Sequence, residues 1–315
     1  MPSKTYILCP GQGAQAVGMG KDFFEKSAAA KQVFERANAI LGFDLSAICF
    51  AGPEDRLNQT DISQPAIYVT SIACHAAAVE AKLIDQAAPA EFAGLSLGEY
   101  TALHLAGAFG FETGLKLVAA RGRYMQEAAT ANPSSMVAVM GADDAAVEKL
   151  CEESRGDGVL VPANYNSPGQ IVVSGSTASC QTFTEKAAAA GFKAIPLKVA
   201  GAFHSPLMQS GADRMEAELD KAPIERPQRT VWANVTAQAH TDPAAIRSLL
   251  VDQIVKPVRW AQTMAALNAA APDARWIELA PGRVLTGLLK KVNRRAAVEN
   301  LSAADSLTAP VAGHS

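Results

Sequence analysis

The segment GLSLGEY, Gly94–Tyr100, holds Ser96 between two glycines, just after a short apolar run and just before a helix-compatible stretch. A Gly-x-Ser-x-Gly turn between a strand and a helix presents the serine hydroxyl on a tight bend, where it can act as a nucleophile. The same letters also arise in ordinary loops, so the motif alone is only moderately specific. A serine nucleophile additionally requires a general base and donors for an oxyanion.

The histidines supply the candidates for that base, which must lie within hydrogen-bond reach of the serine. Of the five, His75 and His104 fall in Ala-rich helical segments, where a packed structural histidine is the commoner case. His240 and His314 fall in polar loop or tail segments. His204 follows an apolar run and stands where the chain is expected to re-enter its larger domain, so we predict that it is the base.

Alternating strand and helix patterns surround these residues and indicate an α/β fold. The first part of the chain predicts a strand at residues 5–9 that runs into a Gly-rich turn, helices over 20–41 and 63–83, strand, turn and helix over 91–109, and a helix over 111–129. The last part predicts a helix over 212–222, a strand over 229–235, a helix over 243–270 and a strand over 274–280, followed by the segment 281–292.

The middle of the chain follows a different order, β-α-β-β-α-β, which is that of the ferredoxin-like unit. A Ser-Pro-Gly triplet at 167–169 marks the turn between its two central strands. We therefore predict a main domain built from residues 1–130 and 199–301 and an inserted subdomain of residues 131–198. The small, polar residues 302–315 are expected to form a flexible tail.

The composition is that of a folded globular protein: 49% of the 315 residues are hydrophobic, 19% are charged and the formal net charge is −3. This balance offers no strong electrostatic field for nucleic acid, and the basic cluster at 290–295 is expected to be a solvated helix face. Five widely spaced cysteines without a C-x-x-C pair indicate buried thiols in a reducing compartment, with neither a disulfide framework nor a zinc site. No secretory or membrane-spanning run is apparent, so we expect a cytoplasmic protein.

Seven segments, in uninterrupted order, carry a resemblance to a known family: GQGAQ (11–15), SQPA (63–66), GLSLGEY (94–100), RGRYMQ (121–126), NYNSPGQ (164–170), GAFHSPLM (201–208) and PGRVLTGL (281–288). Together they resemble the malonyl-CoA:acyl carrier protein transacylases, over about Lys4 to Leu301. The resemblance implies an α/β-hydrolase-like core with a parallel sheet and an inserted ferredoxin-like subdomain. It also implies transfer of the malonyl group from malonyl-CoA to the phosphopantetheine thiol of acyl carrier protein, for fatty acid biosynthesis, without metal or other cofactor. We expect the protein to be a monomer.

Matching the motifs position by position, the resemblance implies that Ser96 is the nucleophile and His204 the general base and acid. In this family a main-chain carbonyl orients the histidine, and Gln253 falls at the matching place. The oxyanion hole would consist of the backbone N–H groups of Leu97 and Gln12, whose donors are preorganised for the developing charge. The chain would then be an acyltransferase that works by a ping-pong Ser-His mechanism.

Arg121 matches the residue that pairs with the free carboxylate of the malonyl group, which a planar guanidinium can bind through two hydrogen bonds. Phe203 resembles the malonyl-selective form of the pocket. One departure is Leu95, where many members carry histidine; the base does not depend on it, but the packing under the turn does. Lys186 and Lys193 are expected to meet an acidic carrier protein beside the cleft between the two domains.

Three other functions fit parts of the pattern. A hydrolase or esterase would use the same acyl-serine with water in place of the carrier thiol. A trans-acting acyltransferase of a polyketide synthase would share the chemistry and differ in its partner. A non-catalytic acyl or carrier-protein binding module would not need Ser96, His204 and Arg121 together, and their joint presence argues against it.

Overall fold

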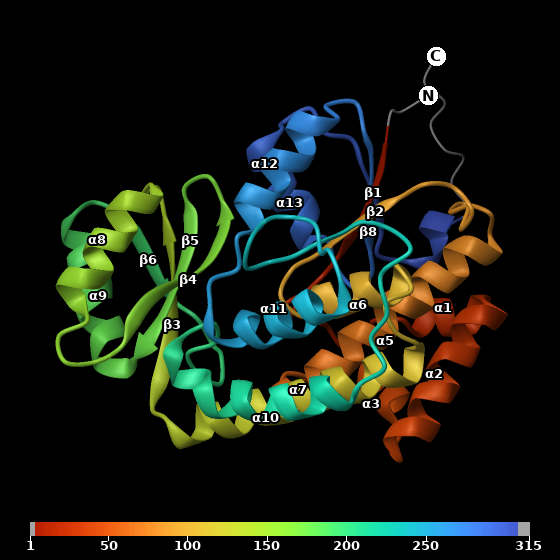
Figure 1. Cartoon of the computed structure of the whole chain (residues 1–315), viewed down its shortest axis with the longest axis horizontal. Coiled ribbons are helices and arrows are strands. Elements are labelled where there is room, and N and C mark those ends of the chain that lie inside the picture. Colours follow the sequence, from red (N-terminus) through yellow and green to blue (C-terminus); the bar gives the residue numbers. More distant parts are fainter. Residues whose placement is uncertain (1–3, 308–315) are drawn as a thin grey trace.

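The computed structural model describes residues 4–307, and at its centre lies a parallel sheet of five strands in the order β7-β2-β1-β8-β9 (Figure 1). Every neighbouring pair in this sheet is parallel. The strands are β1 (Thr5–Cys9), β2 (Glu91–Gly94), β7 (Val231–Trp232), β8 (Arg275–Leu279) and β9 (Val298–Leu301).

Helices cover both faces of this sheet, and the central strand explains why. In β1, Ile7 and Cys9 belong to one hydrophobic cluster and Tyr6 and Leu8 to a second, so successive side chains are buried on opposite faces. A strand buried on both faces reads as a continuous apolar run, as TYILC does. Helices α5 (Thr60–Glu80) and α7 (Phe111–Ala131) supply many residues of the first cluster, and α2 (Ala28–Leu41) packs against α5. Helices α12 (Trp260–Ala270) and α13 (Val284–Val292) supply residues of the second.

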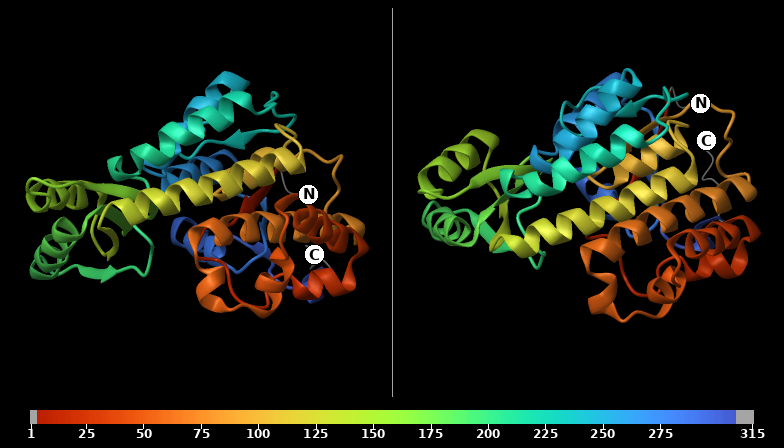
Figure 2. Two further views of the ribbon diagram at one scale, coloured as in Figure 1. Left: turned by 90° about the horizontal axis from the view of Figure 1, so that it is seen from below. Right: turned by 60° about the horizontal axis from the view of Figure 1, so that its bottom comes forward.

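The remaining helices of the large domain complete its outer layer. They are α1 (Lys21–Lys26), α3 (Leu45–Ala51), α4 (Glu54–Leu57), α6 (Gly98–Leu105), α10 (Gln209–Lys221) and α11 (Pro243–Val255). A 3₁₀ turn, η1 (Pro206–Met208), precedes α10. Figure 2 shows α7 running beside α10 along the large domain towards the small one, where β3 begins.

Two of the predicted helices are each broken in two. The helix expected over 20–41 stops at Ser27, which is extended and whose side chain accepts a hydrogen bond from the N–H of Ala30, so that it caps α2. The helix expected over 243–270 stops at Lys256, which is extended because Pro257 follows it. The second break matters for the site, because it lets α11 and α12 run in different directions.

The middle of the chain forms a separate antiparallel sheet with the order β4-β5-β3-β6. Its elements are β3 (Ser134–Met140), α8 (Asp144–Ser154), β4 (Leu160–Ser167), β5 (Gln170–Ser176), α9 (Thr177–Ala189) and β6 (Lys193–Pro196). The predicted β-α-β-β-α-β order is therefore the observed one. Hydrogen bonds from the N–H of Tyr165 to the carbonyl of Val258, and from Val258 N–H to Ala163, join this sheet to the large domain.

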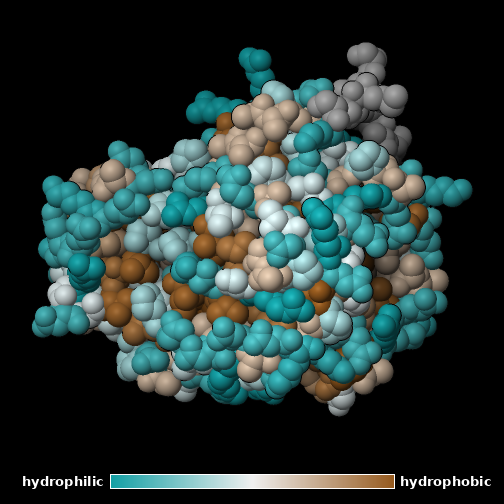
Figure 3. All heavy atoms as spheres, viewed as in Figure 1, coloured by the Kyte–Doolittle hydropathy of each residue, from teal (hydrophilic) through white to brown (hydrophobic). Residues whose placement is uncertain are grey.

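The two faces of the small sheet have different neighbours. Val137 and Val173 pack under α8 and α9, whereas Met136 and Val172, one position away, join the core of the large domain. On the face in Figure 3 most of the outer surface is hydrophilic, and apolar atoms gather in the hollow between the small sheet and the large domain. The open face of the small sheet thus forms one wall of a cleft.

Part of the predicted tail is placed by the structure. Residues Ala304–Leu307 form a 3₁₀ turn, η2, whose Ala304 is buried and whose Leu307 packs against the main core. Residues 308–315 lie outside the described part of the chain, as do residues 1–3. No helix within residues 4–307 combines the length and apolar character needed to cross a membrane.

Candidate active site

Ser96 lies at the turn between β2 and α6, with a φ of 51°, a left-handed conformation that non-glycine residues seldom adopt. The flanking glycines make this turn possible. A Cβ on Gly94 would lie 1.9 Å from the carbonyl group of Gly98, and one on Gly98 would lie 2.1 Å from the carbonyl oxygen of Cys9 in β1. The turn is further held by Asn234, which accepts from the N–H of Ser96 at 2.6 Å and donates to the carbonyl of Gly94 at 2.7 Å.

His204 faces the serine hydroxyl, as the sequence predicts. Its Nε2 lies 2.9 Å from Ser96 Oγ, and its Nδ1 lies 2.6 Å from the main-chain oxygen of Gln253. Because a carbonyl oxygen can only accept, Nδ1 carries the proton and Nε2 accepts from the hydroxyl. Burial, and then the nearby charge of Arg121, lower the pKa of His204 to about 4. The imidazole is therefore neutral near pH 7, which is the state that can remove a proton.

Arg121 is a buried cation beside the nucleophile, with 1% of its surface exposed. Its Nη1 donates to Gln64 Oε1 at 2.7 Å, and its Nη2 donates to Gln253 Oε1 at 2.8 Å and to Ser96 Oγ at 3.1 Å. Burial lowers the pKa of this guanidinium. Within residues 4–307 no carboxylate forms an ion pair with Arg121. A buried guanidinium that lacks a contacting anion is suited to receive the carboxylate of a ligand.

These groups open into a cavity of about 550 Å³ between the large domain and the small sheet. Ser96, Arg121 and His204 lie in its wall together with Phe203 and Leu95. The small sheet contributes Met136, Asn164, Asn166 and Val172, and the segment after β6 contributes residues 197–200. The mixture of apolar walls and a few convergent polar groups is typical of a site for a small-molecule substrate.

The Gly-rich turn after β1 lies against the nucleophile turn, because a Cβ on Gly11 would come within 2.2 Å of the carbonyl oxygen of Leu95. Gln12 follows Gly11 and lines the cavity, and its side-chain Nε2 lies 3.5 Å from Thr60 Oγ1. Leu97, the residue after the nucleophile, is fully buried and immediately precedes α6. The two segments predicted to supply the oxyanion donors are thus neighbours.

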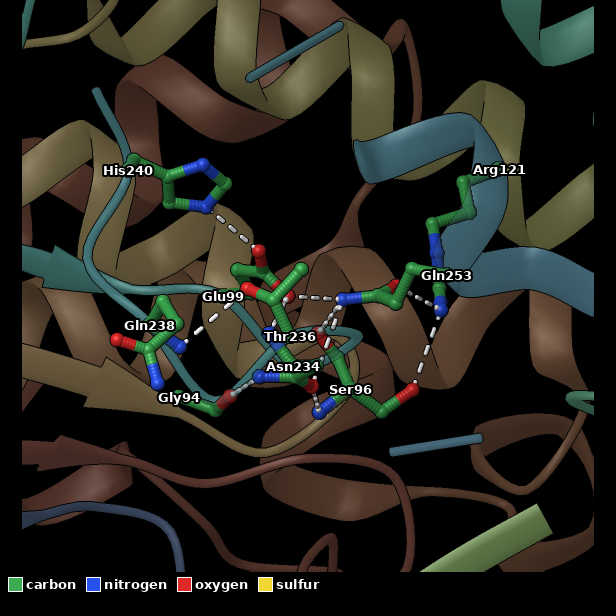
Figure 4. Close-up of polar contacts among 9 residues, drawn as sticks. All are labelled: Gly94, Ser96, Glu99, Arg121, Asn234, Thr236, Gln238, His240 and Gln253. Carbon is green, nitrogen blue, oxygen red and sulfur yellow. Dashed lines mark hydrogen bonds and ion pairs between the residues drawn. The ribbon is translucent and has the colours of Figure 1, made fainter. Parts of the chain in front are cut away.

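Sequence reasoning assigned no role to three residues behind the nucleophile: Glu99, His240 and Asn234. The Glu99 carboxylate is fully buried and contacts His240 Nε2 at 2.7 Å and Gln253 Nε2 at 2.6 Å (Figure 4). Glu99 belongs to the GLSLGEY motif. The available signal was therefore an acidic residue directly after a turn that was expected to be buried. His240 and Asn234 come from a distant loop, and no local pattern connects them with Ser96.

The other histidines lie away from the cavity. His104 Nδ1 lies 3.0 Å from the carbonyl of Phe109, and His75 is a buried residue of α5 whose burial lowers its pKa to about 4. His314 lies outside the described residues. All five cysteines are buried and free, as predicted. In the described chain, no three His, Cys, Asp or Glu side chains come together as a metal-binding group.

Comparison with known proteins identifies a family and several relatives that are similar to this chain over nearly its whole length. The family described as acyl transferase domain matches residues 5–314. Malonyl CoA-acyl carrier protein transacylase of Bacillus subtilis is 40% identical over 296 residues, which cover 93% of this chain and 92% of the relative. The corresponding Coxiella burnetii structure superposes with a TM-score of 0.92 at 34% identity, covering 98% of this chain and 96% of that one.

A further solved structure is that of a type II PKS acyl-carrier protein in complex with its malonyl-transacylase. It matches with a TM-score of 0.91 at 35% identity, covering 97% of this chain and 98% of that one. These relatives share both the fold and more than a third of the aligned residues with this chain, over nearly the whole length of each protein. The chain therefore belongs to the malonyl CoA-acyl carrier protein transacylase family of acyltransferases.

Proposed function

We propose that this chain transfers the malonyl group from malonyl-CoA to the phosphopantetheine thiol of acyl carrier protein, for fatty acid biosynthesis, through an acyl-enzyme on Ser96. One observation carries the proposal: the Ser96 hydroxyl lies 2.9 Å from His204 Nε2 and 3.1 Å from Arg121 Nη2. In a malonyl thioester the carboxylate is only one methylene away from the reacting carbonyl. A guanidinium that binds it must therefore lie close to the nucleophile, as Arg121 does.

In the first half-reaction His204 Nε2 takes the proton of the Ser96 hydroxyl while Oγ attacks the thioester carbonyl. Collapse of the tetrahedral intermediate breaks the carbon–sulfur bond, and the departing CoA sulfur receives the proton from His204. In the second half-reaction the carrier thiol gives its proton to His204 and attacks the acyl-serine. The carbon–oxygen bond then breaks, and Ser96 recovers a proton from His204.

Two features of the site assist these steps. The Gln253 carbonyl holds the proton on Nδ1, so that Nε2 faces the serine, and it stabilises the imidazolium that forms after proton transfer. The bound carboxylate would offset the charge of Arg121, one of the causes that lower the pKa of His204. Malonyl binding would therefore strengthen the base. The oxyanion would be held by the backbone N–H groups of Leu97 and Gln12, and Phe203 would shape the acyl end of the pocket.

The finer description of the fold is also part of the proposal. An order of β4-β5-β3-β6 with α8 and α9 on one face supports a ferredoxin-like subdomain over residues 131–198. The Gly-x-Ser-x-Gly turn at the end of a parallel strand supports an α/β-hydrolase-like core over 1–130 and 199–301. A cytoplasmic location, a monomeric state and independence from metals and other cofactors stay predictions from the sequence.

The acyl-enzyme provides a direct test. Incubation with malonyl-CoA should add one malonyl group to the intact mass, and a phosphopantetheinylated carrier protein should discharge it. Ser96→Ala should abolish the adduct. A persistent adduct on that variant would contradict the assignment of the nucleophile, and discharge by water as fast as by the carrier would favour the hydrolase.

A further inference from the structure

Glu99 is a carboxylate buried directly behind the nucleophile turn, in the first turn of α6. Its Oε1 contacts His240 Nε2 at 2.7 Å, and its Oε2 accepts from the N–H of Asn234 at 3.1 Å and from Gln253 Nε2 at 2.6 Å. Among the described residues, neither lysine nor arginine forms an ion pair with it. Figure 4 shows these side chains meeting on the side of the turn away from the serine hydroxyl.

The contacts of His240 indicate which of its two ring nitrogens carries a hydrogen. The His240 side chain is fully buried, and its Nδ1 has no hydrogen-bond partner among the described residues. An imidazolium would need an acceptor at each nitrogen, whereas a neutral ring protonated on Nε2 needs only one. His240 therefore fits as a neutral donor to Glu99. Each described contact of the Glu99 carboxylate is then a donor, as an ionised carboxylate requires.

This carboxylate fixes the orientation of an amide that touches the site. Since Glu99 Oε2 only accepts, Gln253 must turn its amino group towards Glu99 and the carbonyl of Ser96, at 2.6 and 2.9 Å. Its amide oxygen is then left for Arg121 Nη2 at 2.8 Å. Turning the amide by half a rotation would place oxygen against the carboxylate and N–H against the guanidinium. The amide thus links a buried anion to a buried cation that do not touch.

We propose that Glu99, held by His240, is a positioning residue for malonyl selectivity: it orients the Gln253 amide and so holds the Arg121 guanidinium beside Ser96. The expected effect on malonyl transfer rests on the proposed function, whereas the orientation of the Gln253 amide follows from the hydrogen bonds alone. The site has two tasks under this proposal: acyl transfer by Ser96 and His204, and recognition of the malonyl carboxylate by Arg121. Acetyl and malonyl groups both need Ser96 and His204, whereas only malonyl needs the guanidinium in its place.

Glu99→Gln is the first variant, because it keeps the size of the side chain and replaces one acceptor oxygen by an amino group. With its oxygen towards His240, the new amide directs N–H groups at Gln253 and favours the turned amide there. The kcat/KM for malonyl transfer should fall by about tenfold or more, mainly through KM, and that for acetyl transfer should fall less. The ratio of the two is the readout, since loss of folded protein would lower both equally.

His240 offers a second pair of variants. His240→Leu leaves Glu99 Oε1 without its donor and should lower the malonyl-to-acetyl ratio. His240→Gln can place an amino group near the position of Nε2, and it should restore most of the ratio. Equal losses in both variants, without a change in the ratio, would overturn the role assigned to His240.

Glu278→Gln is the matched control. Glu278 is equally buried, but its carboxylate accepts from the N–H groups of Leu285 and Thr286 at the start of α13, and it does not line the cavity. This variant should leave the malonyl-to-acetyl ratio unchanged. If Glu99→Gln behaved in the same way, Glu99 would be a structural carboxylate and the proposal would fall.

Crystal structures of the parent protein and of Glu99→Gln give a readout that does not depend on activity. The contact between Arg121 Nη2 and Gln253 Oε1 should be lost in the variant, and its retention would overturn the positioning role. A parent protein that transferred neither acyl group would instead contradict the proposed function. Should Glu99→Gln fail to fold, the same contact can be compared in His240→Leu and His240→Gln.

Discussion

At the scale of single residues, the hydroxyl of Ser96 is shared between a neutral base and a buried cation. Arg121→Ala should lower malonyl transfer severely, because the carboxylate would then be buried without a partner. Acetyl transfer should be unharmed or improved. Charge-assisted hydrogen bonds of about 1.5–3 kcal/mol correspond to about a ten- to hundredfold change in the ratio of the two rates.

Arg121→Lys completes this prediction. A point charge cannot reproduce the two-pronged geometry of a guanidinium, so lysine should recover only part of the malonyl rate. Both acyl groups should be assayed on each variant. A parallel change in the malonyl and acetyl rates would remove Arg121 from the substrate site.

The lowered pKa of His204 predicts an unusual pH profile. A base whose pKa is depressed from 6.5 to about 4 stays unprotonated as the solution is acidified, so the rate is lost only as the pH approaches 4. Arg121→Ala removes one cause of the depression, and the acidic limb should move to higher pH. The check is kcat/KM for acetyl transfer against pH in both proteins. Superimposable limbs would show that the charge of Arg121 does not act on His204.

How much of the site could be predicted differs from residue to residue. Ser96 belongs to a local motif, and His204 could be chosen from five histidines by its neighbours in the sequence. The hydrogen bonds that link Glu99 to Asn234 and Gln253 join residues 135 and 154 positions apart. No local pattern encodes such pairs, because they depend on how the sheet and α11 pack. Gln64, the partner of Arg121, was part of a quoted motif but received no role for the same reason.

At the scale of secondary structure, the nucleophile turn depends on the close approach of β1, β2 and α6. A Cβ on Gly98 would lie 2.1 Å from the Cys9 carbonyl oxygen, a main-chain atom that cannot swing aside. Gly98→Ala should therefore lower the free energy of unfolding by about 1–3 kcal/mol, as overpacking does, and reduce acylation by displacing Ser96.

Gly287→Ala in α13 is the control for this substitution, because a Cβ there meets nothing within 4 Å. It should raise the stability by about 0.5–1 kcal/mol, since alanine loses less backbone entropy in a helix. Urea unfolding of the two variants measures both effects. Equal stabilities would mean that the turn tolerates a wider separation from β1 than the structure indicates.

The elements themselves were predicted better than their ends. The order of strands and helices in the small domain was predicted correctly, because apolar residues of β3, β4, β5, α8 and α9 are buried together in one cluster. The helix predicted over 243–270 was wrong at Pro257, although the proline was visible in the sequence. The apolar pattern continued across the break, because both α11 and α12 pack on the core. Two packed helices in sequence therefore showed the same pattern as one long helix.

At the scale of the whole molecule, the small sheet turns one face to the cleft and carries α8 and α9 on the other. This arrangement corrects the expected docking surface. Lys186 lies on α9, and its Nζ donates to the carbonyl of Glu153 in α8, so it is remote from the cleft face. Lys193 pairs with Met140, whose side chain shares a face with the cavity-lining Met136. Of the two lysines, only Lys193 lies on the same face of the small sheet as the cavity wall, and its contact with the carrier stays a prediction.

We expect the proposed acidic carrier protein to approach Ser96 along this face, where complementary charge would chiefly raise the rate of association. Lys193→Glu should slow discharge of the malonyl-enzyme by the carrier severalfold, with the difference shrinking as salt screens it over about 10 Å at 0.1 M. Lys186→Glu should leave this rate unchanged, because that lysine lies on the opposite face. Discharge by free pantetheine, which carries no acidic protein surface, should be the same in all three proteins. A slower reaction with pantetheine would mean that Lys193 acts on the acyl-serine itself, and an equal effect of both lysine variants would place the carrier elsewhere on the small domain.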